Sequence, residues 1–401
     1  MSPLLLQDLP VQNKRALLRV DFNVPLKEDG TVGDLMRIKE SIPSIEFLIK
    51  NGAKVILLSH LGRPKGIKNL KYSLKPCAEA LSKLLDKEVL FLSDCLEKET
   101  KDSIDQMKPG GIVLLENLRF YEAEEKPEKD LNFAKTLASY GDLYINDAFA
   151  ASHRSHSSIT FLPHYFPNSA AAGFLLQKEI KELTALCINP KRPFHAIIGG
   201  AKVSSKLGII QAFIEKADAL YIGGAMSFTF FKALGCSIGN SLFEPNLVDT
   251  AKKLISLCKE KNIPLFLPED VLVADSLKKD AQKKIINILK EEIPDEFQGV
   301  DIGPKTFLSW KDSLQKASSI FWNGPLGVFE IEPFANGTFS LIRFLASFSS
   351  AIRVVGGGGS AAAIHELHLS KDFTYISTGG GASLEFIEFG HLPGIDALTQ
   401  K

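Results

Sequence analysis

Hydrophobic positions along the chain follow two patterns that alternate from start to end. Short apolar runs are separated by longer stretches in which apolar residues recur every three or four positions. The short runs are typical of strands buried on both faces, and the longer stretches are typical of amphipathic helices. Such alternation predicts an α/β protein with parallel sheets. In the first half the predicted strands are Arg15–Val20, Val55–Leu58, Val89–Leu92, Ile112–Leu115 and Leu143–Ile145.

One long helical stretch separates this half from a second half with the same alternation. Between residues 169 and 189 apolar side chains recur at helical spacing, and Asn189-Pro190 then ends the helix, because a proline ring cannot continue one. We therefore expect two doubly wound parallel-sheet (Rossmann-like) domains, joined by this linker helix and with a cleft between them. The apolar stripe of the helix consists of Leu176, Ile180, Leu183 and Cys187. The strands predicted for the second half are His195–Ile198, Ala219–Ile222, Leu265–Leu267, Ile320–Trp322, Arg353–Val355 and Tyr375–Ser377.

Length, composition and charge fit two domains and exclude some functions. At 401 residues the chain is longer than one hydrophobic core usually serves. The 47 Lys and Arg residues balance the 47 Asp and Glu residues, which argues against a dedicated nucleic-acid or membrane-surface binder. No apolar run approaches the roughly 20 residues of a membrane span, and the first residues do not read as a signal peptide. The scattered cysteines, without CxxC spacing, predict reduced thiols in a cytoplasmic protein. They are Cys77, Cys95, Cys187, Cys236 and Cys258.

Basic side chains follow the predicted strands of the first half, which is where open α/β sheets bind ligands. A single arginine there is more often paired with a surface carboxylate, but several at equivalent strand ends of a neutral protein need an anionic partner. Guanidinium groups bind phosphate or carboxylate through two parallel hydrogen bonds. Asp21 and Asn23, after the first strand, accept hydrogen bonds either from substrate hydroxyls or from the turn itself. The basic candidates are His60, Arg63, Arg119, His153 and Arg154, with Arg37 from an adjoining segment.

Glycine-rich turns follow the strands of the second half instead. Glycine between a strand and a helix lets the backbone approach a phosphate, and the helix start offers free N–H groups and the positive end of a dipole. Several such turns, with Lys202 and Lys206 beside the first, indicate a polyphosphate ligand. Neither GxGxxG nor GxxxxGK[ST] occurs, so this half is neither a standard dinucleotide site nor a P-loop. Together the two halves imply phosphoryl transfer in a cleft that closes to exclude water.

Seven motifs along the chain can be compared with known families. They are RVDFNVP (19–25), SHLGRP (59–64), ENLRF (116–120), NDAF…HRSHSS (146–158), GGAKVSSK (199–206), NGPLGVFE (323–330) and STGGGASLEF (377–386). In this order they resemble the phosphoglycerate kinase family, over essentially the whole chain. The resemblance implies reversible phosphoryl transfer between 1,3-bisphosphoglycerate and ADP, which yields 3-phosphoglycerate and ATP. It also implies Mg²⁺ together with ATP or ADP.

The resemblance attaches ligands to the predicted domains. Residues 1–168 would form the N-terminal 3-phosphoglycerate-binding domain, 169–189 the interdomain helix and 190–376 the C-terminal nucleotide-binding domain. Residues 377–401 would return to the N-terminal domain. The partners would be the small-molecule substrates, with no nucleic acid and no membrane, and we expect a monomer.

The same resemblance assigns roles to single residues. Those implied to neutralise charge on the phosphoryl group in transit are Arg37, Lys202, Gly379 and Gly380. Those implied to bind 3-phosphoglycerate are Asp21, Asn23, Arg37, His60, Arg63, Arg119, His153 and Arg154. Those implied to bind the nucleotide are Lys202, Lys206, Gly299, Asn323, Pro325, Glu330, Gly357, Gly358, Gly359 and Ser360.

One departure from the family pattern concerns the metal. Gly359 stands where the family has an Asp that coordinates the nucleotide-bound metal, so the metal ligands of this chain are unknown from its sequence. A glycine has no side chain to ligate Mg²⁺, although this ion often keeps several waters and uses only one or two carboxylates. We expect weaker metal–nucleotide affinity and lower turnover, with 3-phosphoglycerate binding intact.

Two other functions compete with this interpretation. The first is a catalytically weakened protein that binds 3-phosphoglycerate without efficient transfer, and Gly359 is its support. The second is a two-domain nucleotide-dependent dehydrogenase. That function predicts GxGxxG followed by an acidic residue about 20 positions later, and the sequence lacks this pattern.

Overall fold

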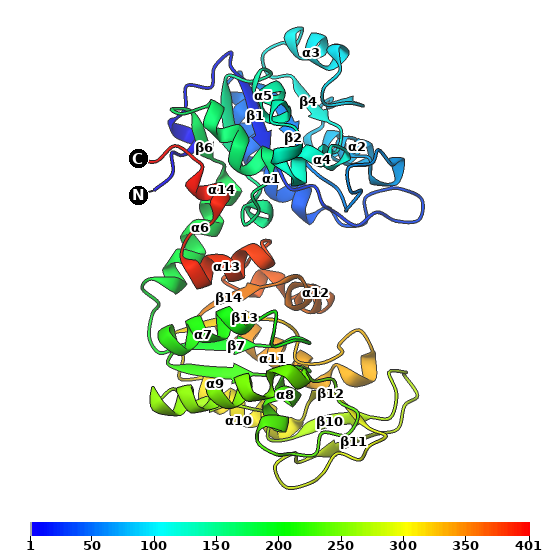
Figure 1. Ribbon diagram of the computed structural model, residues 1–401, viewed down its shortest axis with the longest axis vertical. Helices are drawn as coiled ribbons and strands as arrows, with labels where there is room; N and C mark the ends of the chain where they lie inside the picture. The colour runs from blue at the N-terminus through cyan, green and yellow to red at the C-terminus, as the bar shows by residue number, and fades with distance from the viewer. Residues whose placement is uncertain (1) are drawn as a thin grey trace. The chain divides into compact units, whose positions relative to one another are not determined.

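The computed structural model describes residues 2–401, apart from the side chain of Cys187. The chain forms two compact units: unit 1 contains residues 1–181 and 391–401, and unit 2 contains residues 182–390. Each unit has a six-stranded sheet, and unit 2 carries a further three-stranded sheet (Figure 1). All strand pairs within the two larger sheets are parallel, and helices alternate with their strands. The predicted α/β fold class is therefore confirmed.

In unit 1, β1 (Arg15–Arg19) lies between β2 (Lys54–Leu58) and β5 (Leu143–Asn146). The sheet order β3-β4-β2-β1-β5-β6 changes direction at β1, the kind of position at which open α/β sheets bind ligands. The other strands are β3 (Leu90–Leu92), β4 (Ile112–Leu115) and β6 (Ala170–Ala172). The helices are α1 (Met36–Lys50), α2 (Lys75–Leu85), α3 (Lys98–Asp105), α4 (Glu122–Glu125), α5 (Asn132–Ala138), the start of α6 (Phe174–Cys187), and α14 (Pro393–Asp396).

The core of unit 1 explains why these segments form strands and helices. β1, β2 and β4 are buried along almost their whole length, as uninterrupted apolar runs require. Leu18, Leu57 and Leu114, one from each of these strands, join a single buried cluster. Ile45 of α1 and Leu81 of α2 belong to the same cluster, so the apolar stripes of both helices pack into this core.

Unit 2 repeats the plan with β7 (Phe194–Ile198) between β13 (Ser319–Asn323) and β8 (Ala219–Ile222). Its sheet order is β15-β14-β13-β7-β8-β9. The other strands of this sheet are β9 (Leu265–Phe266), β14 (Ile352–Gly356) and β15 (Tyr375–Ile376). The helices are α7 (Leu207–Lys216), α8 (Ser227–Ala233), α9 (Val248–Glu260), α10 (Pro304–Leu314), α11 (Asn336–Ser347), α12 (Gly358–Glu366) and α13 (Gly381–Phe389).

The smaller sheet of unit 2 was not predicted. It consists of the antiparallel strands β10 (Val271–Ala274), β11 (Lys283–Ile286) and β12 (Gln298–Ile302), in the order β11-β10-β12. The first three residues of β11 are exposed, and β12 begins with polar and glycine residues. Neither segment therefore has the continuous apolar run by which the parallel strands were recognised.

The predicted linker helix begins later than expected. Residues 170–172, assigned to this helix from the sequence, form strand β6, whose residues pair with β5. Thr399 N donates to the carbonyl of Ala170, and Ala172 N donates to the carbonyl of Leu4, so both chain ends hold this strand. α6 starts at Phe174, after Gly173. Leu176, Ile180 and Leu183 lie on this helix, while the side chain of Cys187 lies outside the described residues.

Gly173 is required by the contact between β5 and the start of α6. A Cβ atom at this position would lie 2.3 Å from Oδ1 of Asp147, the residue that follows β5. The Asp147 carboxylate is fully buried, accepts a hydrogen bond of 3.1 Å from Leu176 N, and leaves Oδ2 without a partner. Burial raises the pKa of Asp147 to about 7, although hydrogen bonds from Ser44 and the backbone of α6 oppose the shift.

We expect Asp147 to make unit 1 less stable above neutral pH. Since its folded pKa of about 7 lies above the value of 3.8 for an unperturbed carboxyl, its contribution to stability is complete below pH 3.8 and is lost as pH rises through about 7. At about 1.36 kcal/mol per pKa unit, the full loss is about 4 kcal/mol, of which about 3 kcal/mol falls between pH 5 and pH 8. Denaturant unfolding of the full chain and of Asp147→Asn at pH 5 and pH 8 checks this. The wild-type loss should shrink in the variant, and an equal loss in both proteins would contradict it.

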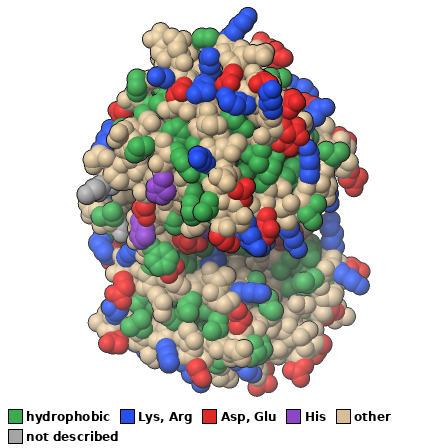
Figure 2. Space-filling view, turned by 45° about the horizontal axis from the view of Figure 1, so that its top comes forward, with side chains coloured by type: hydrophobic (Ala, Val, Ile, Leu, Met, Phe, Trp, Pro, Cys, Tyr) green, Lys and Arg blue, Asp and Glu red, His purple; other side chains and the backbone are tan. Residues whose placement is uncertain are grey.

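The surface and the thiols fit the composition. Figure 2 shows Lys and Arg side chains interspersed with Asp and Glu over the face in view, in keeping with 47 residues of each sign. The four cysteines whose side chains are described, Cys77, Cys95, Cys236 and Cys258, are free thiols. Among residues 2–401, no helix combines the length and apolar character that a membrane crossing needs.

Candidate active site

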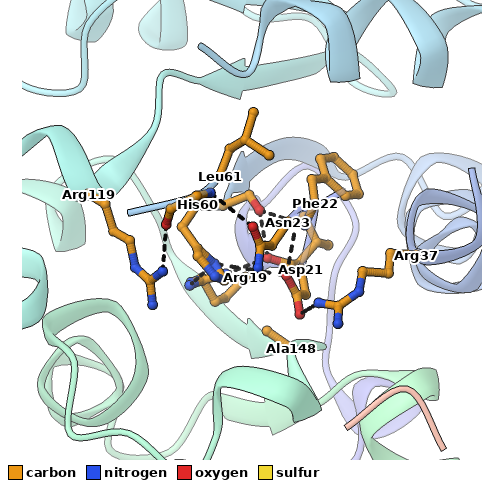
Figure 3. Close-up of polar contacts among 12 residues, drawn as sticks. Arg19, Asp21, Phe22, Asn23, Arg37, His60, Leu61, Arg119 and Ala148 are labelled. Atoms are coloured by element: carbon orange, nitrogen blue, oxygen red, sulfur yellow. Dashed lines mark hydrogen bonds and ion pairs between the residues drawn. The ribbon is translucent and has the colours of Figure 1, made fainter. Parts of the chain in front are cut away.

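The turn after β1 places Asp21 and Asn23 at the carboxyl edge of the unit 1 sheet (Figure 3). Asp21 is buried, and its Oδ1 accepts a hydrogen bond of 3.0 Å from the backbone N of Asn23. Its Oδ2 accepts from Nη1 of Arg37, which lies on the first turn of α1. Asn23 Oδ1 accepts a 2.9 Å bond from Gly62 N. Hydrogen bonds therefore link the β1 turn to α1 and to the loop after β2.

The loops after β2 and β4 bring His60 and Arg119 to the same edge. Both side chains are buried. Arg119 Nη1 donates a 2.8 Å hydrogen bond to the carbonyl of Gly62, and its Nε lies 3.2 Å from Glu125 Oε1 as an ion pair without hydrogen-bond geometry. His60 accepts at Nδ1 from Arg19, a residue of β1 that lies beneath this edge. Four segments distant in sequence therefore converge at one place.

The charges in this cluster repel one another. Burial and the neighbouring cations Arg19, Arg119 and Arg37 hold the pKa of His60 well below its ordinary value. Burial, followed by Arg119, Arg19 and Arg154, lowers the pKa of His156 to about 3. Burial and Arg154 lower the pKa of His153, and burial also lowers that of Arg119. A bound anion would relieve this repulsion, so the cluster is suited to phosphate or carboxylate.

The structure brings together most of the predicted substrate-side residues. Asp21, Asn23, Arg37, His60 and Arg119 are joined by hydrogen bonds or share partners within unit 1. His153 and Arg154, in the segment after β5, interact with this cluster through charge. Arg63 lies exposed on the loop after β2, and its role stays a prediction.

Three buried residues behind this site were not predicted from the sequence. Arg19, Glu124 and Ser158 are fully buried behind His60 and hydrogen bond to one another or to it. A signal for Arg19 was present, since a charged residue that ends an otherwise apolar strand must have a buried partner. Glu124 lies in a run rich in charged residues, 121–130, of the kind that is usually solvated, and only the fold shows that its carboxylate is buried.

In unit 2, the glycine turns after β7 and β13 fit against each other. Gly199 N donates to the carbonyl of Asn323, and Gly200 N donates to that of Pro325. A Cβ atom on Gly199 would lie 2.3 Å from the Pro325 carbonyl oxygen, so only glycine allows this approach. Gly324 has a φ of +93° and donates its N–H to Oγ of Ser360 on α12, over 2.7 Å. The predicted residues Asn323, Pro325 and Ser360 are thus structurally connected.

A cavity of about 290 Å³ lies beside these turns. Its lining includes three predicted nucleotide-side residues, Gly299, Pro325 and Glu330. Phe228 of α8 and Leu326 add apolar surface, which is suited to a flat aromatic ring such as a nucleobase. Lys202, Lys206, Asn323 and the residues from Gly357 to Ser360 are not part of this lining.

The two lysines of the first turn differ in environment. Lys206 caps α7 and donates from Nζ to Oδ1 of Asn323. Burial lowers the pKa of Lys206 to about 8. Lys202 lies exposed in the turn, where Ser205 Oγ bonds to its carbonyl. Asn323 Nδ2 is buried without a partner, which leaves a free donor next to Lys206.

The starts of α12 and α13 provide the remaining predicted residues. Gly357 precedes α12 with a φ of +89°, Gly380 precedes α13 with a φ of +54°, and Gly379 N donates to Ser377 Oγ. Positive φ at these positions favours glycine, and each helix start leaves backbone N–H groups free for an anion. Gly358 and Gly359 are the first two residues of α12.

These residues do not form a protein cage for a metal. Across residues 2–401, no group of three or more His, Cys, Asp or Glu side chains is arranged to hold a metal ion, within the part whose side chains are described. Position 359, where the family pattern has Asp, offers no side-chain oxygen. The donors at the start of α12 are backbone N–H groups, which attract phosphate and not a cation.

We expect Gly299→Ala to weaken nucleotide binding by closing the cavity. A Cβ atom there would lie 1.9 Å from Cζ of Phe228, so the ring must move. Overpacking of this kind costs about 1–3 kcal/mol of stability, and a displaced ring should reduce ADP affinity at least about tenfold. Calorimetric titration with ADP checks this. The double variant Gly299→Ala with Phe228→Leu makes room and should recover part of the affinity, and unchanged ADP affinity in the single variant would contradict the prediction.

Fold and sites together define a class of protein: a two-unit α/β protein with a cluster of cationic side chains at the sheet edge of one unit and glycine turns beside a cavity in the other. A family model described as phosphoglycerate kinase matches residues 6–389. A phosphoglycerate kinase of Fervidobacterium nodosum is 47% identical, covering 100% of this chain and 99% of that protein. One of Chlorobium phaeobacteroides is 48% identical, covering 98% of each. The solved phosphoglycerate kinase structure from Coxiella burnetii matches with a TM-score of 0.87 at 38% identity, covering 98% of both chains. This chain belongs to the phosphoglycerate kinase family, as its motifs predicted.

Proposed function

We propose that this protein catalyses reversible phosphoryl transfer between 1,3-bisphosphoglycerate and ADP, giving 3-phosphoglycerate and ATP in glycolysis and gluconeogenesis. Membership of an enzyme family over residues 6–389 supports a kinase. The observation that carries the substrate side is the cluster of buried His60 and Arg119 with half-buried Arg37, whose mutual repulsion favours an anion. Unit 1 would bind the triose and unit 2 the nucleotide. The predicted domain boundaries at 168, 189 and 376 belong to this proposal.

In unit 1, guanidinium and imidazole N–H groups would bind the carboxylate and phosphate of 3-phosphoglycerate, while Asp21 and Asn23 would accept from its hydroxyl. Arg119 and His60 are held in place by the protein, which reduces the entropy lost on binding. Arg63, His153 and Arg154 would complete the ring of cations. Arg37 would extend from α1 toward the group that is transferred.

In unit 2, the cavity beside Gly299, Pro325 and Glu330 would take the adenosine of ADP or ATP. Lys206 with Asn323, and the amides at the starts of α12 and α13, would bind the phosphates. Gly357, Gly358, Gly359 and Ser360 supply the α12 start, and Gly379 and Gly380 precede α13.

The transfer itself needs no general base. A β-phosphate oxygen of ADP, already anionic, attacks the acyl phosphorus, and the bond from phosphorus to the carboxyl oxygen of the triose breaks. The departing group is a carboxylate, so no proton has to move. What the protein must supply is positive charge and N–H donors around the moving phosphoryl group, from Arg37, Lys202 and the amides of Gly379 and Gly380. We infer in-line transfer after a hinge-like closure that excludes water.

Magnesium would accompany the nucleotide, held chiefly by phosphates and water, because Gly359 gives it no carboxylate. No step above depends on a protein-bound ion. A monomer in the cytoplasm remains part of the proposal, supported by the balanced charge and the free thiols.

Gly359 also favours a second candidate: a weakened form that binds 3-phosphoglycerate without efficient transfer. Coupled turnover with 3-phosphoglycerate and ATP across a magnesium titration decides between the two. Near-normal turnover that saturates at ordinary magnesium supports the kinase. Absent turnover together with retained 3-phosphoglycerate binding would support the weakened form.

We expect ADP affinity to fall as pH rises above about 8. The Lys206 ammonium attracts phosphate, but its lowered pKa of about 8 means that it loses the proton there, whereas an ordinary lysine stays charged. The loss can reach about tenfold per pH unit. ADP titrations from pH 7 to pH 10 check this. Lys206→Arg keeps its charge throughout and should flatten the profile, so an equally steep fall in that variant would contradict the assignment to Lys206.

A further inference from the structure

Arg19 makes extensive side-chain contacts behind the unit 1 site. It ends β1, is fully buried, and uses all three guanidinium nitrogens: Nε donates to Ser158 Oγ over 2.8 Å, and Nη1 donates to the Val20 carbonyl. Nη2 lies 3.1 Å from Nδ1 of His60 (Figure 3). With every nitrogen bound, the orientation of the guanidinium is fixed.

The contact with His60 determines where the imidazole proton lies. A guanidinium can only donate hydrogen bonds, so His60 Nδ1 must accept and carry no proton. A neutral imidazole with a bare Nδ1 carries its proton on Nε2. Among the described residues, Nε2 of His60 has no hydrogen-bond partner, and it is not one of the fully buried unpartnered atoms. Its N–H therefore remains available to a ligand.

On the other side of Arg19, the buried carboxylate of Glu124 fixes the direction of the hydrogen bonds made by Ser158. Ser158 Oγ accepts from Arg19 and donates to Glu124 Oε1 over 2.6 Å, while Ser158 N donates to Oε2 over 3.0 Å. Glu124 Oε1 lies 3.8 Å from Arg19 Nη2, close enough to balance its charge. One chain of hydrogen bonds thus links Glu124, Ser158, Arg19 and His60. In each bond the chemistry of the groups determines which atom donates and which accepts.

Other charged groups around His60 compete with or support this arrangement. Asp21 Oδ1 lies 3.9 Å from Nδ1 and would favour a proton there, but it is beyond hydrogen-bond distance, whereas Arg19 is within it. Arg119, His156 and Arg37 act with burial and Arg19 to lower the pKa of His60, which keeps the ring neutral. Burial raises the pKa of Glu124, and Arg19 and Ser158 oppose that shift.

We propose that Arg19 is a positioning residue that fixes His60 as the neutral tautomer with its proton on Nε2, so that His60 presents an N–H donor to an anionic ligand. Arg19 itself lies too deep to touch the ligand. It acts by fixing the orientation and the protonation of the His60 ring. The identity of the ligand rests on the proposed function, but the tautomer does not.

The first test uses the full chain without ligand. Long-range ¹H–¹⁵N correlation spectra of the histidine rings, with His60 assigned from the missing signals of His60→Gln, report which nitrogen is protonated. We expect a protonated Nε2, a bare Nδ1 and a neutral ring at neutral pH, because burial and the neighbouring cations hold the pKa of His60 well below its ordinary value. A proton on Nδ1, or an imidazolium at neutral pH, would overturn the proposal whether or not the protein is a kinase.

Variants then test the role of Arg19. Arg19→Met combined with Glu124→Gln removes both buried charges together, so that neither remains unpaired, and should move the proton to Nδ1, toward Asp21. Arg19→Lys keeps one donor for Nδ1 and should restore the Nε2 tautomer. Ser157→Ala is the matched control, since Ser157 Oγ donates to the Ala123 carbonyl and lies outside the chain of hydrogen bonds.

Kinetics separate this role from a structural one. We expect the charge-free double variant to raise KM for 3-phosphoglycerate at least about tenfold with little change in kcat, as loss of one hydrogen bond to a charged group predicts. Arg19→Lys should recover most of this affinity. An Nε2 proton that persists in the double variant would refute the role of Arg19. Absence of turnover in the wild type would refute the proposed function and leave the spectra as the test.

Discussion

Arg37→Ala should lower kcat about 10²–10³-fold while 3-phosphoglycerate still binds, the loss expected when one preorganised donor to a developing charge is removed. Arg37 starts from the first turn of α1, and only one of its nitrogens is engaged with Asp21. Its side chain is 34% exposed, unlike the buried His60 and Arg119. Part of its guanidinium is therefore free for a ligand group outside the buried cluster.

Steady-state kinetics in both directions would check this, with KM and kcat determined separately. Arg37→Lys keeps one positive charge but loses the planar fork, so an intermediate kcat is expected. Arg15→Ala is the matched control, because Arg15 pairs with Asp142 and Asp105 at the start of β1, away from its carboxyl end. If Arg37→Ala raised KM and left kcat intact, Arg37 would be a ground-state ligand and its proposed place at the moving group would be wrong.

The sequence predicted the parallel sheets because their strands are buried on both faces. Such strands consist of continuous apolar runs, and β4 and β8 were placed at their observed bounds from that pattern alone. β6 was misassigned because Ala170–Ala172 suits a helix by propensity. Its pairing with β5, and the hydrogen bonds from Thr399 and to Leu4, override that propensity.

The residues at the sheet edge could also be predicted from the sequence, whereas the buried Glu124 and Ser158 behind them could not. His60 and Arg119 lie in the loops that follow β2 and β4, so topology alone brings them to one edge. The position of Glu124, on α4, does not follow from the topology of the strands in this way. Its carboxylate becomes buried only because α4 packs on the segment that contains Ser158, about thirty residues later. Long-range packing of this kind leaves no periodic trace in a single sequence.

Gly359→Asp should strengthen magnesium-dependent ADP binding about 10- to 100-fold, by analogy with other groups that hold a metal. Gly359 is the second residue of α12 and has an ordinary helical backbone, so a side chain is compatible with its conformation. A carboxylate at a helix start is also favoured by the helix dipole. The obstacle is Pro325, whose Cδ would lie 3.0 Å from the new Cβ, so this ring must shift by a few tenths of an ångström.

Gly359→Asn isolates the carboxylate, because it meets Pro325 with the same Cβ and has nearly the same shape without the charge. Calorimetric titrations with ADP, with and without magnesium, should show a gain for the Asp variant only when magnesium is present. The Asn variant should show no gain in either condition. Equal affinities in all three proteins would mean that phosphates and water already satisfy the ion at this site. In that case the glycine at position 359 would be no impediment, and the case for a weakened form would lose its only support.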